Sequence, residues 1–72
     1  MQAHEFLLKL HDTESNLMSE GYALRESGRC VDSWSRKTAA GNEQAIVTRA
    51  EDMGDYSITV QRYPAHRCTA LA

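Results

Sequence analysis

The most constraining feature of this sequence is the stretch 56–63, in which apolar and polar residues alternate and most residues are β-branched or aromatic. This alternation predicts a strand with one buried face, because successive side chains of a strand point to opposite faces. Tyr56, Ile58 and Val60 are expected to face a core. The polar positions of the opposite face are Ser57, Thr59 and Gln61. The rest of the chain must then cover the apolar face.

The chain has 72 residues, of which 42% are hydrophobic and 25% are charged. This balance is typical of a folded domain and unlike that of a disordered segment. A chain of this length buries only about 60% of the surface that its unfolded form exposes, so few side chains form the core. We therefore expect one small domain over residues 1–72.

Residues 2–19 show the period of an amphipathic helix. The apolar residues that recur at steps of three and four are Ala3, Phe6, Leu7, Leu10, Leu17 and Met18. The polar run 11–16 interrupts this stripe, which leaves either one helix or two short helices with Asp12 or Thr13 as the second N-cap. We expect one helix that covers the apolar face of the strand.

Two glycines, Gly21 and Gly28, punctuate the next segment. One interpretation is a hairpin of residues 22–26 and 29–36, which places Leu24 opposite Val31 and Glu26 opposite Arg29. The alternative continues the helix to residue 27 with Gly28 as its C-terminal cap, although an internal glycine costs about 1 kcal/mol relative to alanine. We expect the hairpin, with Trp34 facing inward and its indole N–H requiring an acceptor.

A second hairpin is predicted from residues 45–50 and 56–63, joined by a loop of about five residues. This register places Ile46 opposite Val60 and Thr48 opposite Ile58, with Val47 on the uncovered face. Pro64 ends the last strand because proline cannot donate to a sheet. The predicted fold is α+β: an N-terminal helix packed on a three- or four-stranded antiparallel sheet, in the order α-β-β-β-β.

The formal charge of −2 gives no general attraction to phosphate or to acidic lipid. Residues 1–28 are the acidic part, with five acids against two bases, whereas residues 29–72 hold five acids and six bases. No apolar run approaches the roughly 18 residues that span a bilayer, so we expect no membrane association and a cytoplasmic location. Two cysteines, Cys30 and Cys68, are too few for a disulfide framework, although one bridge stays open as an alternative.

The sequence contains no glycine-rich phosphate loop, nucleophile elbow or paired Cys-x-x-Cys motif. Cys30, His66 and Cys68, with a helix histidine such as His11, are residue types that bind zinc, but their spacing matches no zinc motif. A nucleophilic pair of Cys68 and His66 would lack an orienting group and an oxyanion hole. We therefore expect no metal, no cofactor and no catalysis.

Nucleic-acid binding through the sheet is the alternative function. The residues that would carry it are Arg36, Lys37, Arg49, Arg62 and Tyr63. Basic and aromatic side chains on one sheet can contact phosphates and stack on bases. Five acids share the same segments, however, and the closely spaced aromatic residues of RNA-binding sheets are missing. This hypothesis therefore ranks second.

Non-catalytic binding to another protein or protein complex is the favoured function, because one helix leaves the other face of the sheet and an edge uncovered. The predicted contact residues are Glu14, Glu20, Val47, Arg49, Ser57, Thr59 and Gln61. An uncovered edge also offers a route to a homodimer. In general style the chain resembles the small acidic inhibitors that phages and other mobile elements carry, and this resemblance implies inhibition of a nucleic-acid-handling complex.

Overall fold

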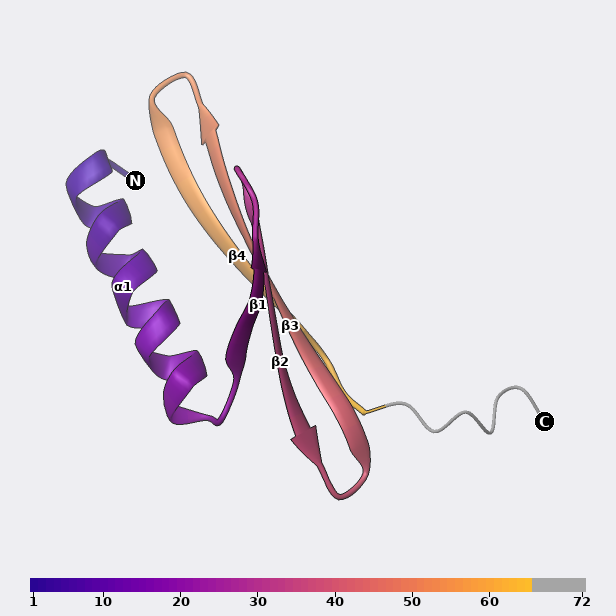
Figure 1. The fold of residues 1–72 in the computed structure, drawn as a ribbon. Coiled ribbons are helices and arrows are strands. Elements are labelled where there is room, and N and C mark those ends of the chain that lie inside the picture. The colour runs from indigo at the N-terminus through magenta and orange to yellow at the C-terminus, as the bar shows by residue number, and fades with distance from the viewer. Residues whose placement is uncertain (66–72) are drawn as a thin grey trace.

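The computed structural model describes residues 1–65 (Figure 1). In chain order the elements are helix α1 (Ala3–Ser19) and strands β1 (Ala23–Ser27), β2 (Val31–Thr38), β3 (Gly41–Asp52) and β4 (Asp55–Tyr63). The strands form one antiparallel sheet in the order β1-β2-β3-β4. The predicted α+β fold and its element order are confirmed.

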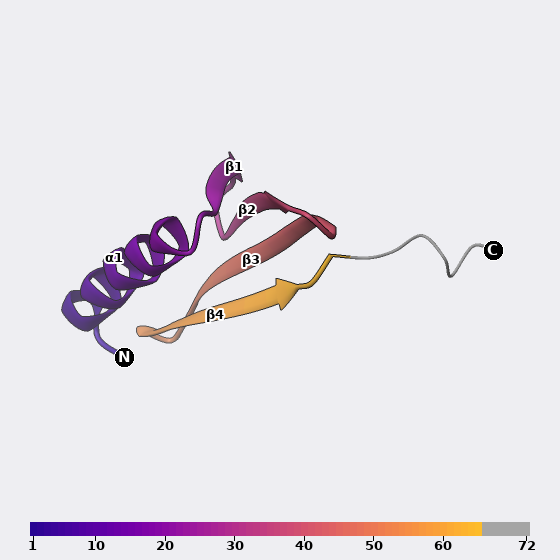
Figure 2. The same cartoon turned by 90° about the horizontal axis from the view of Figure 1, so that it is seen from below.

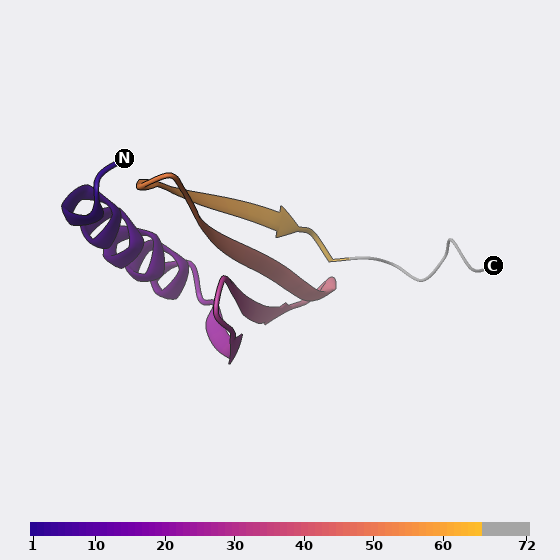
Figure 3. The same cartoon turned by 90° about the horizontal axis from the view of Figure 1, so that it is seen from above.

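Helix α1 is continuous through the polar run at residues 11–16, as predicted, and Gly21 turns the chain after it with a φ of 95°. Figures 2 and 3 show that α1 lies on one side of the sheet only. The helix faces the sheet through Phe6, Leu10 and Leu17, whereas Leu7 and Met18 are exposed. The apolar stripe is therefore narrower than the sequence predicted. Among residues 1–65, no helix is long and apolar enough to cross a membrane.

The core lies between α1 and one face of the sheet. Its buried apolar residues are Leu17, Tyr22, Trp34, Ala45 and Val47, against which Leu10, Ile58 and Val60 pack. Trp34 is 3% exposed, so its predicted inward orientation is confirmed. The outward positions predicted for Ser57, Thr59 and Gln61 are also confirmed, since all three are exposed. A core of this size makes each large side chain important for stability.

The predicted register of the β3–β4 hairpin is wrong by one residue. The strands are joined by two residues, Met53 and Gly54, with φ values of 51° and 83°, and two positive φ values are what a type I′ turn requires. Val47 therefore lies opposite Val60 and is fully buried. A one-residue shift moves a whole strand's side chains to the other face, so Ile46, not Val47, lies on the uncovered face.

The predicted register of the β1–β2 hairpin is also wrong. The turn lies at residues 29–30 instead of the predicted 27–28, and the Gly28 N–H donates to the Val31 carbonyl across it at 2.7 Å. Leu24 consequently lies opposite Trp34, and Ser27 lies opposite Asp32. A bulge between Leu24 and Glu26 adds a further offset.

Strand β4 ends at Tyr63, directly before Pro64, as predicted. The predicted alternatives that involve His66 or Cys68 lie outside the described residues.

Candidate functional site

The two faces of the sheet differ in charge. Directly opposed residues of neighbouring strands share a face, so the register assigns every side chain of β2, β3 and β4 to one face. The face that α1 covers, here called the covered face, holds six charged residues: Asp32, Arg36, Glu43, Arg49, Glu51 and Arg62. Most of these charges are engaged in ion pairs.

Asp32 and Arg49 form the most buried ion pair. Asp32 is 2% exposed, and its Oδ1 accepts from Arg49 Nη2 at 3.1 Å and from the Ser27 hydroxyl at 2.7 Å. The same Arg49 nitrogen donates to the Gly28 carbonyl at 2.6 Å. Arg49 therefore ties the β1–β2 hairpin to β3. Its predicted role as a contact residue on the uncovered face does not fit this position.

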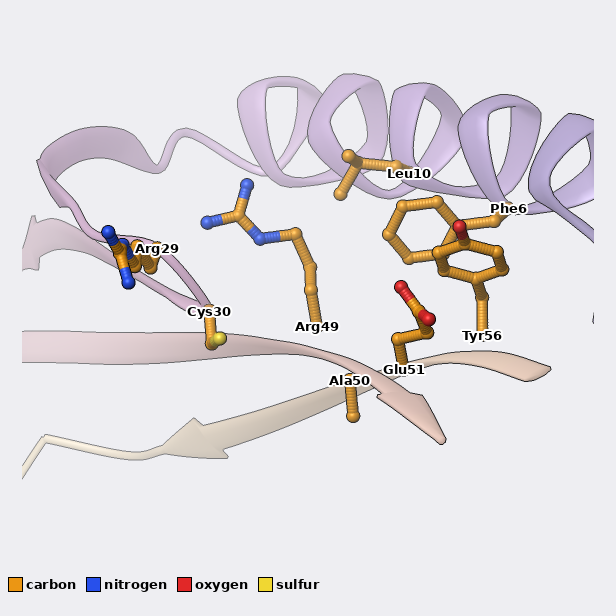
Figure 4. A pocket seen from close by; sticks show the side chains of 8 residues that line it. All are labelled: Phe6, Leu10, Arg29, Cys30, Arg49, Ala50, Glu51 and Tyr56. Atoms are coloured by element: carbon orange, nitrogen blue, oxygen red, sulfur yellow. The ribbon is translucent and has the colours of Figure 1, made fainter. Parts of the chain in front are cut away.

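A pocket of about 280 Å³ lies beside Arg49, between α1 and the sheet (Figure 4). The residues that line it are Phe6, Leu10, Arg29, Cys30, Arg49, Ala50, Glu51 and Tyr56. The rings of Phe6 and Tyr56 close one end, with centroids 4.9 Å apart, and the Arg49 side chain extends toward α1. Within residues 1–65, no group of three or more His, Cys, Asp and Glu side chains is placed to hold a metal ion.

Three of the five predicted nucleic-acid residues, Arg36, Arg62 and Tyr63, line one small pocket, whereas Lys37 and Arg49 lie outside it, and both arginines of the pocket are already paired. Arg36 pairs with Glu43 at 2.7 Å, donates to the Glu20 carbonyl and stacks over the Tyr22 ring. Its hydrogen bond to Glu43 raises the pKa of Arg36 above the ordinary arginine value. Arg62 forms an ion pair with Glu20 at 2.9 Å, so two residues that were predicted to contact a partner contact each other instead. Of the predicted set, only Lys37 and Tyr63 occupy the uncovered face.

The uncovered face of the sheet carries a continuous set of neutral residues, which we call the open face. Its members are Val31, Ser33, Ser35, Gln44, Ile46, Thr48, Ala50, Ser57, Thr59, Gln61 and Tyr63. Gln44 donates to the Ser33 hydroxyl at 3.2 Å, and the Tyr63 hydroxyl donates to Gln61 at 3.0 Å. Among residues 1–65, no helix or strand lies over this surface.

Charged residues border the open face on three sides. Lys37 lies at one end of the strands, and the opposed Asp52 and Asp55 lie at the other end. Arg25 and Glu26 of the bulged strand β1 lie along its side, where Arg25 Nε donates to the Ser35 hydroxyl at 2.7 Å. The open face is thus a neutral centre with a charged border.

A second surface is the α1–β1 groove, a hollow of about 500 Å³ lined by Glu14, Met18, Tyr22, Ala23, Leu24 and Trp34. Met18 and Leu24 are 58% and 47% exposed. The predicted acceptor for Trp34 is not found, since its buried Nε1 has no partner in the described part of the chain. The sequence singled out only Glu14 of this set for binding. Met18 and Leu24 are apolar residues of predicted elements, and they were the signal by which the predicted binding set could have been extended beyond Glu14.

The edges of the sheet are less open than the sequence predicted. Strand β1 has five residues, all exposed, and its bulge and charged Arg25 and Glu26 are features that discourage pairing with another strand. At β4, the Tyr56 N–H donates to the Met1 carbonyl at 2.9 Å, which occupies part of that edge. Dimerisation through an edge stays a prediction.

Comparisons of the chain with protein-family models, with curated proteins and with solved structures find no match. Its class is therefore given by its architecture: a small α+β domain whose four-stranded antiparallel sheet is covered by a helix on one face.

Proposed function

We propose that this protein is a non-catalytic protein-binding module that contacts its partner through the open face. The observation that carries the proposal is the absence of charge from eleven adjacent surface positions. Of the nine charged residues of β2, β3 and β4, six lie on the covered face. The other three, Lys37, Asp52 and Asp55, lie at the ends of the strands and leave the middle of the uncovered side without charge.

A neutral centre suits a protein interface for a physical reason. Removing a charged side chain from water costs much free energy unless the charge is paired. Removing a hydroxyl or amide group costs less, and such a group can replace its hydrogen bonds to water with hydrogen bonds to a partner. The centres of protein interfaces are accordingly depleted in charged residues and enriched in aromatic ones, with a polar rim. Ile46, Val31 and Tyr63 supply apolar area, and the charged border would orient the partner.

Nucleic-acid binding is the weaker hypothesis because Arg36, Arg49 and Arg62 already form ion pairs and lie on the covered face. Phosphate binding needs cations that are free to release counterions. Inhibition of a nucleic-acid-handling complex remains the narrower prediction for the partner's class.

The test begins with capture of binding proteins from the source cell by the tagged chain, followed by purification of the captured protein and measurement of its affinity. Thr59→Arg places a charge on the open face, midway along its edge strand β4, and we expect it to lower the affinity by about tenfold or more. Leu8→Glu is the matched control, because Leu8 is an exposed residue of α1 that lies far from this face.

Both variants alter exposed positions and should keep the fold, which far-ultraviolet circular dichroism checks. Equal affinity of the wild type and Thr59→Arg would contradict the proposal, as would a larger loss for the Leu8 variant. Failure to capture any protein, with oligonucleotides bound instead at low salt, would favour the nucleic-acid hypothesis.

A further inference from the structure

The α1–β1 groove points to a second mode of recognition. We infer that it receives one large apolar side chain, together with a neighbouring lysine or arginine, from a peptide segment of a partner protein. The groove lies on the covered side of the sheet, because Leu24 is directly opposite the buried Trp34. It is therefore separate from the open face, and either proposal can fail without the other.

The shape and lining of the groove fit an apolar side chain. Its volume of about 500 Å³ lies within the range of roughly 300–1,000 Å³ that is usual for ligand sites. Tyr22 and Trp34 are buried beneath it, while Met18 and Leu24 on its two walls stay about half exposed. An inserted side chain would remove both of these from water, which favours binding in proportion to the apolar area buried.

The charge of the groove specifies the neighbouring residue. Glu14 is the one ionisable carboxylate in its lining, it is partly buried, and it makes no ion pair among the residues that the structure describes. Glu20, by contrast, is paired with Arg62. A cation next to the apolar anchor would complement the Glu14 carboxylate.

A peptide is favoured over a second copy of this chain because Glu14 is the one charged residue in the lining of the groove, so two copies packed groove to groove would bring like charges together. Addition of a strand to β1 is not part of the inference, since the bulge between Leu24 and Glu26 interrupts that edge. Recognition would rest on side chains.

The test uses random peptides of about twelve residues, displayed on phage and selected on the full chain, with individual selected peptides then synthesised. Trp34 is the only tryptophan of the protein, so its fluorescence reports occupancy of the groove directly. We expect the selected peptides to share an apolar residue beside lysine or arginine, and to change the emission of Trp34 on binding.

Three variants give the expected pattern. Leu24→Glu should weaken these peptides by about tenfold or more, because it places a charge in the apolar wall. Glu14→Gln should weaken them by about threefold to tenfold at low salt and less at high salt, because it removes the charge complementarity. Leu8→Glu, on the outer side of α1, should leave the affinity unchanged.

Met18→Glu replaces Leu24→Glu if the latter loses its native circular dichroism spectrum, since Met18 is the more exposed wall residue. Peptides without basic residues, equal binding to wild type and Leu24→Glu, or selection of no peptide would each overturn the inference. Self-association of the free chain that Leu24→Glu abolishes would overturn it too, in favour of a second copy. Thr59→Arg, which tests the open face, should not change peptide binding.

Discussion

Ile46 and Val47 are adjacent in the chain and lie on opposite faces of the same strand. Val47 is fully buried beneath α1, whereas Ile46 belongs to the open face. The two faces also use charge in opposite ways. The covered face contains the ion pairs of Asp32 with Arg49 and of Arg36 with Glu43, and the centre of the open face contains no charge. Charge in this sheet therefore holds the strands and the helix together on one side and is confined to the border of the other.

The difference follows from the incomplete cover that one helix gives a four-stranded sheet. The covered face of the sheet is buried in the middle and accessible to solvent at its margins. Charged side chains at these margins can pack their apolar stems against the core while their charged ends form ion pairs. In Arg36 the end group itself makes both contacts, since the guanidinium lies over the Tyr22 ring and its Nε donates to Glu43. The open face needs no such pairs to fold, which leaves its composition free for binding.

The largest contrast between the faces is expected from introducing the same charge on each. Val47→Asp buries a carboxylate without a partner and should cost about 4 kcal/mol or more, which is enough to unfold a domain of this size. Ile46→Asp should cost only about 1 kcal/mol or less. Urea denaturation followed by circular dichroism measures both. Equal losses for the two variants would show that the register is wrong.

A smaller effect is expected from the buried ion pair. Asp32→Ala leaves Arg49 without its main partner and should destabilise the protein by about 2–3 kcal/mol, below the range for fully buried pairs because Arg49 is 21% exposed. A double-mutant cycle with Arg49→Met should give a coupling free energy of about 1 kcal/mol or more. Additive effects of the two substitutions would mean that the pair does not fasten the hairpin to β3.

The turn that sets the register offers a stabilising change. Met53 adopts a φ of 51°, which favours asparagine or glycine, so Met53→Asn should raise the free energy of unfolding by about 0.5–1 kcal/mol. Gly54→Ala is the matched control: its added methyl meets no atom within 4 Å, yet its φ of 83° should make it destabilising by about 1 kcal/mol. A turn that tolerates both changes equally would not be of type I′.

The smallest effect is expected at the exposed pair of Glu20 and Arg62, whose side chains are 39% and 48% exposed. Glu20→Gln should change stability by about 0.5 kcal/mol or less, and 1 M salt should remove the difference. A salt-independent loss would assign Glu20 a structural role beyond this pair.

The helix and the four strands could be predicted because each depends on local periodicity and on glycine punctuation. The inward Trp34 could be predicted because a large indole is favoured in the core of so small a domain. The buried face of β3 could not be predicted, because residues 45–47 are all apolar and either face of the strand could therefore belong to the core. The turn between β3 and β4 sets the register of the two strands. Met53 has a positive φ in this turn, but it is neither asparagine nor glycine, the residues by which such a turn is usually recognised in a sequence. The prediction consequently placed Val47 with the binding residues and Ile46 in the core.

Residues of the candidate site could be predicted only in strands whose buried face was assigned correctly. Ser57, Thr59 and Gln61 were assigned to the correct face, because β4 alternates cleanly. Arg49 was not, since it shares its face of β3 with Val47, and the one-residue error in the predicted register placed both on the uncovered face. The α1–β1 groove likewise depends on how α1 lies over the sheet, which no local pattern specifies.

The protein has two isoleucines, Ile46 on the open face and Ile58 on the covered face, so methyl labelling of isoleucine yields one signal for each side. Cross-saturation from the captured partner protein tests the central claim directly. We predict that saturating the partner attenuates the Ile46 methyl signal and leaves that of Ile58 unchanged. Attenuation of Ile58 alone, or of neither methyl in a complex that forms, would contradict binding through the open face.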